Sequence, residues 1–250
     1  TMGFIEIEHL SHRFPSGKMG LDHITLSIEE GDFTVIAGKN GSGKTTLCRH
    51  LNSLLLPTSG SVTVDGLNVE RHPAKARQIV GMVFQNAEAQ IVGDTVYTDT
   101  AFGPENLGLD RKEIDDRVKQ ALQVTGLSGM EDCPPHILSG GEKRRLAIAG
   151  ILAMNPKVMV LDEPFSNLDY PGARQILQQI LALHRSGKTI ILVTHDLEKV
   201  AAHAEKLVIL EDGKVVCEGS PASVIPSVER FGIREPCSSR LGHGIIPWLN

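Results

Sequence analysis

The sequence predicts an α/β fold built on a largely parallel sheet, and three observations support this prediction. Residues 34–37 form a short apolar run that leads into a glycine-rich loop and then into a helical pattern. Residues 158–161 and 189–193 are continuous apolar runs, as expected for parallel strands covered on both faces. At 250 residues and 41% hydrophobic content, the chain can bury one substantial core.

The glycine-rich loop has the residues and spacing of a phosphate-binding loop. Residues 38–45 read G-K-N-G-S-G-K-T. Its glycines allow left-handed or close-approach backbone, so that successive N–H groups converge on phosphate oxygens. Residues 45–51 continue with helical spacing, which directs a helix dipole at the same phosphates. A glycine-rich surface turn is the alternative, but the loop lies between a strand and a helix as phosphate binding requires. The predicted nucleotide-binding residues here are Gly38, Asn40, Gly41, Ser42, Gly43, Lys44, Thr45 and Thr46.

Two carboxylates follow the apolar run at residues 158–161. Ligands of open α/β sheets bind at the carboxyl ends of the strands, where Asp162 emerges. Lys44 adds positive charge at the β and γ phosphates, while the Thr45 hydroxyl and Asp162 are predicted to hold magnesium. Glu163 lies on the other side of the strand end and is predicted to polarise a water molecule for attack on the γ-phosphate. A solvated Asp-Glu turn is the alternative interpretation.

Further motifs follow in an ordered series. Gln85 comes after residues 81–84, residues 138–142 read L-S-G-G-E, residues 166–169 read S-N-L-D, and His195 follows the run at 189–193. With the phosphate loop, this series resembles the ATP-binding subunits of ABC transporters over residues 4 to about 225. The resemblance implies a phosphate-loop NTPase of the ABC type, with an antiparallel β subdomain and a helical arm.

The resemblance also implies roles for single residues. Phe14 would stack on adenine, a role that suits a flat ring, although core packing would also explain it. Gln85 would contact magnesium or the attacking water, so that Thr45, Gln85 and Asp162 form the metal set. His195 would bond to the γ-phosphate, against the alternative of a satisfied core histidine. The implied catalytic residues are Glu163, His195 and Gln85, and the implied cofactors are ATP and Mg²⁺.

The segment at 138–142, here called the signature segment, is predicted to bind an anion at the start of a helix. Ser139, Gly140 and Gly141 are expected to open a helix whose free N–H groups face an anion. An ordinary helix cap is the other interpretation. By resemblance, the anion is the γ-phosphate bound to the opposite subunit, and Asp169 belongs to the same half-site. Two chains would then sandwich two ATP molecules, the second being an identical chain or a paralogue.

A narrower resemblance covers residues 84–96, 101–107 and 133–150. These segments are similar to the ATPases of energy-coupling-factor transporters, the cobalt and vitamin importers. The similarity implies an ATP-hydrolysing subunit that energises uptake of a metal ion (cobalt or nickel) or a vitamin. Its partners would be integral membrane coupling and substrate-binding subunits, and it would lie peripherally on the cytoplasmic face of the membrane. The chain departs from the commonest pattern at Ala87, Glu142 and Asn167 without losing a group that the chemistry needs.

The rest of the chain sets the predicted domain limits. Residues 1–225 are assigned to the ATPase domain, with the helical arm at about 86–154, and residues 226–250 to a C-terminal tail of partial order. Residue 171 begins a predicted helix that ends at 187, and residues 211–214 read as a hairpin turn. A net charge of −5 gives no footprint for nucleic acid. Neither a membrane-spanning run nor a C-x-x-C pair is present, which predicts a chain of the reducing cytosol that docks on separate membrane subunits.

Two other functions remain open at the level of sequence. The first is an ABC-type ATPase without a transport role, as in DNA repair or translation. Such proteins usually carry a long coiled coil or a second ATPase domain, and neither pattern occurs here. The second is a phosphate-loop kinase or a nucleotide-gated interaction module, which would not need the signature segment or the histidine at 195.

Overall fold

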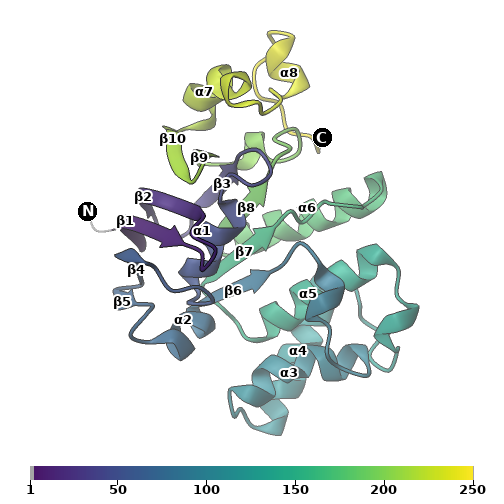
Figure 1. Cartoon of the computed structure of the whole chain (residues 1–250). Helices are drawn as coiled ribbons and strands as arrows, with labels where there is room; N and C mark the ends of the chain where they lie inside the picture. The colour runs from purple at the N-terminus through teal and green to yellow at the C-terminus, as the bar shows by residue number, and fades with distance from the viewer. Residues whose placement is uncertain (1–2, 250) are drawn as a thin grey trace.

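The computed structural model describes residues 3–249, which are organised around two sheets (Figure 1). The larger sheet has six strands in the order β10-β9-β3-β8-β7-β6. These are β3 (Phe33–Ala37), β6 (Val80–Val83), β7 (Val158–Asp162), β8 (Thr189–Thr194), β9 (Lys206–Glu211) and β10 (Lys214–Gly219). Only the β9–β10 pair is antiparallel within this sheet. Every residue of β3, β6, β7 and β8 is buried, which confirms the prediction of a doubly covered parallel sheet.

The smaller sheet is antiparallel, with the order β2-β1-β4-β5. Its strands are β1 (Ile5–Arg13), β2 (Met19–Ile28), β4 (Ser59–Val64) and β5 (Leu67–Asn68). Helix α1 (Lys44–Leu51) contributes Leu47, Cys48 and Leu51 to a core shared with both sheets, and α2 (Pro73–Ile79) adds Ala76. The first turn of α1 is thereby fixed at the carboxyl end of β3.

The helical arm has an apolar cluster of its own in addition to residues that join the core of the large sheet. It contains α3 (Val96–Asn106), α4 (Arg111–Thr125), α5 (Gly140–Ala153) and the short 3₁₀ helices η1 (Ala87–Gln90) and η2 (Pro135–Ile137). Its own apolar cluster includes Val118, Leu122 and Leu146. Helix α4 ends at Gly126, whose φ of 68° is the left-handed conformation common at helix ends. In Figure 1 the arm lies below β6, and its predicted limits at about 86–154 stay a prediction.

Helix α6 (Tyr170–Arg185) covers the face of the large sheet opposite to the face that packs against α1. Its buried residues Ile176, Leu177 and Ile180 pack against that face. The helix begins one residue before the predicted Pro171, because Asp169 caps it by accepting the Gly172 N–H. The predicted hairpin at 211–214 joins β9 to β10, as expected.

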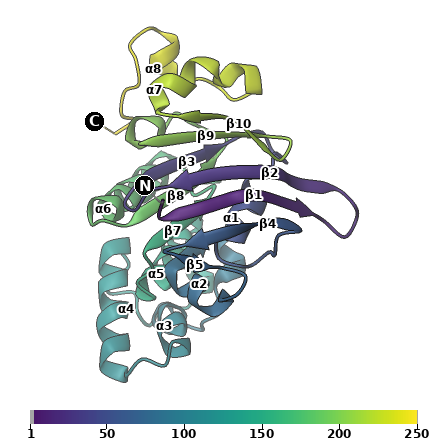
Figure 2. The same ribbon diagram turned by 90° about the vertical axis from the view of Figure 1, so that its left-hand side faces the viewer.

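The C-terminal tail differs from the expectation of partial order. After α7 (Pro221–Val224), the chain forms η4 (Ile225–Phe231) and α8 (Cys237–Arg240), which lie above β9 and β10 in Figure 2. Val228 and Ile233 are buried in the same core cluster as Val224. Apolar side chains of the tail therefore complete the core on one face of the large sheet. The division of the chain at residue 225 stays a prediction.

Two predictions from composition can also be compared with the structure. Within residues 3–249, no helix combines the length and the apolar character needed to cross a membrane. All four cysteines are free thiols, and Cys48 is fully buried, so that burial raises the pKa of its thiol. Cys48 thus has the packing role expected of a small apolar side chain.

Candidate nucleotide site

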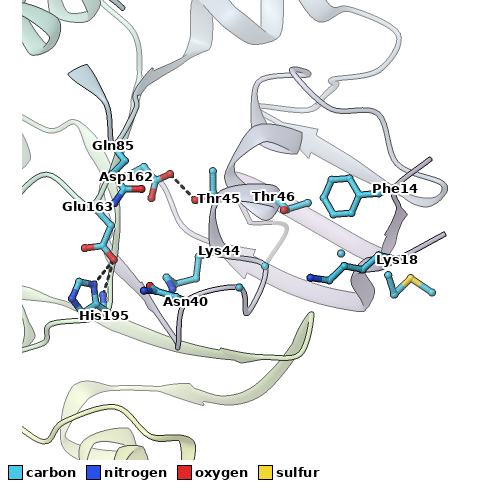
Figure 3. A pocket seen from close by; sticks show the side chains of 14 residues that line it. Phe14, Lys18, Asn40, Lys44, Thr45, Thr46, Gln85, Asp162, Glu163 and His195 are labelled. Atoms are coloured by element: carbon cyan, nitrogen blue, oxygen red, sulfur yellow. Dashed lines mark hydrogen bonds and ion pairs between the residues drawn. The ribbon is translucent and has the colours of Figure 1, made fainter. Parts of the chain in front are cut away.

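One cavity at the carboxyl edge of the large sheet collects most of the predicted site residues (Figure 3). The loops after β3, β6, β7 and β8 all reach it, because these parallel strands end at the same edge. Its volume is about 410 Å³. The lining residues are Phe14, Lys18, Met19, Gly20, Asn40, Gly41, Gly43, Lys44, Thr45, Thr46, Gln85, Asp162, Glu163 and His195.

The phosphate loop needs its glycines for two different reasons. Gly41 and Gly43 have φ angles of 83° and 104°, which favour glycine. Gly38 is required by close approach, since a Cβ there would lie 2.3 Å from the Leu210 carbonyl oxygen. Gly38 and Ser42 are buried within the loop and do not line the cavity. These two residues therefore support the conformation of the loop on its buried side, away from the cavity.

The first turn of α1 faces the cavity with its backbone donors available. The residue that caps this helix is Gly43, so no side chain occupies the free N–H groups. The Lys44 ammonium is buried and donates to the carbonyl oxygens of Gly38 and Lys39 at 2.6 and 2.9 Å. Burial lowers the pKa of Lys44, against the opposing influence of Glu163 and Asp162. The loop thus combines one cation with a helix N-terminus, the arrangement that binds phosphate.

Asp162 and Thr45 meet beside this loop. The Thr45 hydroxyl donates to Asp162 Oδ2 at 2.7 Å, and Asp162 is only 3% exposed. Burial raises the pKa of Asp162, and the Thr45 hydrogen bond offsets part of that shift. Gln85 lines the same cavity, so a carboxylate, a hydroxyl and an amide are available together. These hard oxygen donors fit Mg²⁺, and the desolvated carboxylate is a group that a cation would stabilise.

Glu163 turns away from Asp162 and contacts the end of β8. Its φ of 48° lies in the left-handed region, and its side chain points toward His195 (Figure 3). Glu163 Oε1 lies 2.7 Å from His195 Nδ1 and accepts the His195 N–H at 3.0 Å. Oε2 accepts the Thr194 hydroxyl at 3.2 Å. The His195 side chain remains 58% exposed and faces the cavity, so Glu163 orients the histidine directly.

The Glu163–His195 contact could not be read from the sequence. The two residues are 32 positions apart and meet because β7 and β8 are neighbours in the sheet. The pairing Asp162↔Val193 fixes the register that brings them together. Only the shared position at two strand ends hinted at proximity.

Phe14 lies at the end of the cavity opposite Glu163 and His195 (Figure 3). A Cβ on Gly20 would come within 2.6 Å of its ring, so the glycine makes room for the aromatic side chain. The His12 ring packs edge-on against Phe14 with centroids 4.8 Å apart. Lys18, Met19 and Gly20 also line the cavity, and they were missed by sequence reasoning. The structure brings them there through a turn in which the Phe14 N–H donates to the Lys18 carbonyl.

The signature segment lines a different cavity of about 410 Å³. It brings Ser139, Gly140 and Gly141 together with Asp169, and none of its lining residues belongs to the first cavity. Ser139 caps α5 in a reciprocal pair with Glu142, and these Ser139 hydrogen bonds lower the pKa of the Glu142 carboxyl. The structure therefore shows Ser139 as the N-cap of α5, and the anion-binding role of the signature segment stays a prediction.

Comparison with known proteins identifies the family. The model of the family described as ABC transporter matches residues 21–166 of the chain. The chain belongs to the ABC transporter family. This confirms the predicted fold class and makes the protein an ABC transporter ATPase.

Several relatives of this ABC subunit are named as ATPases of energy-coupling-factor transporters, the type predicted from segments between residues 84 and 150. It is 44% identical over 252 residues to the energy-coupling factor transporter ATP-binding protein EcfA of Methanocaldococcus jannaschii, covering 100% of this chain and 90% of that protein. It is 42% identical over 245 residues to EcfA2 of Clostridium perfringens, covering 93% and 86%. The predicted energy-coupling-factor type is thereby confirmed.

Solved structures agree with this assignment. CbiO1 from Clostridium perfringens, described as part of the ABC transporter complex cbiONQ, superposes with a TM-score of 0.83 at 34% identity. The match covers 97% of this chain and 98% of that one. The dimeric post-hydrolysis state of the cassette MJ0796, bound to ADP and Pi, gives a TM-score of 0.78 at 29% identity, covering 87% and 98%.

Proposed function

We propose that this ABC subunit hydrolyses Mg²⁺·ATP at composite sites shared with a second ATPase subunit and thereby energises an importer of the energy-coupling-factor type. The observation that carries the proposal is the separation of the two half-sites. The cavity of the phosphate loop and the cavity of the signature segment share no lining residue. A second copy or a paralogue would supply the missing half, as the dimeric form of the relative MJ0796 supports.

Nucleotide binding is proposed to use the length of the first cavity. Phe14 stacks on the adenine at one end, and Asn40 and the loop glycines surround the phosphates. Lys44 lies in the loop and supplies positive charge beside the free N–H groups of α1. Thr45 and Thr46 also line the first cavity. From the opposite subunit, Ser139, Gly140, Gly141 and Asp169 would close the site over the γ-phosphate.

A metal is proposed to bind beside the loop. Thr45, Asp162 and Gln85 would hold Mg²⁺, because they converge on one cavity and offer oxygen ligands. When bound, Mg²⁺ neutralises charge on the β and γ phosphate oxygens. The Thr45 hydroxyl donates to the buried Asp162 carboxylate and helps to hold it in place.

The hydrolytic step is assigned to Glu163 and His195. Glu163 takes the proton of the attacking water as the water adds to the γ-phosphorus and the bond to the β-phosphate oxygen breaks. His195, held through Nδ1 by Glu163, would present its other ring nitrogen to the γ-phosphate. Release of phosphate removes this contact together with the contact made by the signature segment of the opposite subunit, so the two subunits lose a bridge. Closure by ATP and opening after hydrolysis then follow from the different affinities of the two states for nucleotide.

Transport requires membrane partners, and the helical arm offers a surface for them. Val92 and Phe102 are large apolar residues that are 61% and 52% exposed on the arm. Large apolar side chains with this much exposure are candidates for a protein interface. We assign this surface to integral membrane coupling subunits, which join a substrate-binding subunit specific for cobalt, nickel or a vitamin. The ATPase would then sit peripherally at the cytoplasmic face of the membrane.

The proposal is tested by co-expression with candidate membrane subunits from the same genome. We expect the chain to copurify with integral membrane proteins in detergent, and the reconstituted complex to take up a metal ion or vitamin in an ATP-dependent way. The Lys44→Ala variant should support neither uptake nor ATP hydrolysis. ATPase activity stimulated by DNA or ribosomes, without any membrane partner, would instead favour the non-transport alternative.

A further inference from the structure

The single tryptophan of the chain, Trp248, packs between two segments that flank the nucleotide site. Its ring meets the ring of Tyr170 at 5.0 Å between centroids and an interplanar angle of 64°. The Lys199 Nζ lies 5.5 Å from the centroid of the same ring. Edge-to-face aromatic pairs and cation–π contacts of this geometry are both attractive. One side chain of the C-terminal tail thus contacts two separate elements of the ATPase core.

Lys199 belongs to the segment that carries the histidine of the site. Residues 195–199, here called the switch segment, follow β8 directly. The Lys199 Nζ lies 2.5 Å from Asp196 Oδ2, and the Asp196 N–H donates to the Thr194 hydroxyl at 3.0 Å. Thr194 and His195 in turn contact the two oxygens of Glu163. A continuous chain of contacts therefore runs from Trp248 to the carboxylate assigned as the base.

The tail holds the switch segment at a second point. The backbone N–H of Cys237, at the start of α8, donates to Glu198 Oε2 at 2.8 Å. Burial alone would raise the pKa of Asp196, but hydrogen bonds from Lys199 and the Glu198 N–H lower it, so the carboxylate stays charged beside Lys199. The tail is therefore attached to the switch segment by a hydrogen bond as well as by the cation–π contact of Trp248.

The other contact of Trp248 leads to the second half-site. Tyr170 is the first residue of α6 and directly follows Asp169, which caps the helix. Asp169 lines the cavity of the signature segment. The Tyr170 side chain is exposed, and its ring packs against the ring of Trp248 at the protein surface. The indole ring therefore bridges an element of the first cavity and an element of the second.

We propose that Trp248 is a positioning residue for ATP hydrolysis, which holds the switch segment against the first turn of α6. It thereby keeps His195 on Glu163 and couples movement of the switch segment to the loop that ends at Asp169. This inference rests on the roles proposed above for His195 and Asp169. Trp248 lines neither cavity, so it acts through Lys199 and Tyr170 rather than on the nucleotide. Its loss should lower kcat and leave nucleotide binding nearly unchanged.

Fluorescence of the single tryptophan gives a direct readout. In the Glu163→Gln variant, saturating ATP with Mg²⁺ should change the emission of Trp248, with the same midpoint as ATP binding measured by calorimetry. The Lys199→Met variant should show a smaller change, because the cation that links the ring to the switch segment is gone. Emission that stays constant while calorimetry shows ATP bound would overturn the proposal.

Kinetics separate a positioning role from a merely structural one. Trp248→Ala should lower kcat about fivefold with KM within about twofold, the size expected from loss of a ring contact and a cation–π contact. Trp248→Phe should recover most of the rate. Ile246→Ala is the matched control, because Ile246 is an exposed apolar residue two positions away and should keep the full rate.

A double-mutant cycle tests the contact itself. Trp248→Ala and Lys199→Met should be non-additive, so that the second substitution changes kcat by less than about twofold. Additive effects, or Trp248→Ala with the rate of the unmodified chain, would refute the positioning role. If Trp248→Ala does not fold, Trp248→Phe and Lys199→Met carry the same cycle. His195→Ala is measured in parallel: full activity there would overturn the proposed function, whereas an inactive His195→Ala beside a fully active Trp248→Ala overturns only this inference.

Discussion

Replacement of Glu163 by glutamine is the sharpest test of the assigned chemistry, because the structure predicts that it removes a base without removing a contact. The carboxylate accepts three hydrogen bonds, from His195 Nδ1, the His195 N–H and the Thr194 hydroxyl, at 2.7 to 3.2 Å. A glutamine oxygen can accept the two bonds from His195, and its NH₂ group can donate to the Thr194 oxygen. The loop after β7 should therefore keep its conformation.

The expected magnitude follows from the chemistry that is lost. A positioned general base contributes roughly 10²–10⁴-fold to a rate, so kcat for Glu163→Gln should fall by at least about 100-fold. ATP affinity should stay within about threefold, because the phosphate loop and Asp162 are untouched. With hydrolysis blocked, ATP should trap the closed pair of subunits.

Three measurements check this prediction: phosphate release, calorimetric ATP binding, and light scattering on a sizing column. Glu205→Gln is the matched control. Glu205 accepts the Phe33 N–H at the amino end of the sheet, far from the cavity, so its replacement should leave kcat unchanged. Glu163→Gln that hydrolyses ATP at a rate near that of the unmodified chain would refute the base assignment. A chain that stays monomeric with ATP bound would refute the composite site.

The remaining predictions address charge, metal and docking. Lys44→Ala should weaken ATP binding at least about tenfold, since it removes charge-assisted bonds to phosphate, and an unchanged dissociation constant in a titration would contradict this. Burial raises the pKa of Asp162 above its value of 3.8 in the unfolded chain, so the folded state binds that proton more tightly and stability is lost as pH rises above 3.8 through the folded pKa. Asp162→Asn should therefore raise Tm at pH 7 while abolishing the effect of Mg²⁺ on ATP binding, and a lower Tm in calorimetry would count against the burial argument. Val92→Asp should cut uptake by the reconstituted transporter while ATP hydrolysis stays within about twofold. Loss of both activities together would show that the surface at Val92 is not a docking surface.

The sequence alone was sufficient for the local parts of the site. The conformation of the loop at residues 38–45 depends on its own backbone and on neighbours in the chain, so glycine spacing and the flanking apolar run predicted it. Likewise, the buried strands at 158–162 and 189–194 were visible as continuous apolar runs, because both faces of a parallel sheet are covered. The resemblance to ABC subunits then supplied the roles of Gln85, His195 and the signature segment.

Contacts between distant segments were decided only by the tertiary structure. The Glu163–His195 pair, the packing of Phe14 against Gly20, and the attachment of Trp248 to Tyr170 and Lys199 each join residues whose distance in space depends on strand order or helix packing. The same holds for the tail, where prolines and glycines obscured periodicity and the buried faces of Val228 and Ile233 became clear only against the sheet. Residue type and spacing determine what a single segment can bind. The partners of a side chain from a distant segment depend instead on how the whole chain buries its apolar surface, and no local sequence pattern encodes that packing.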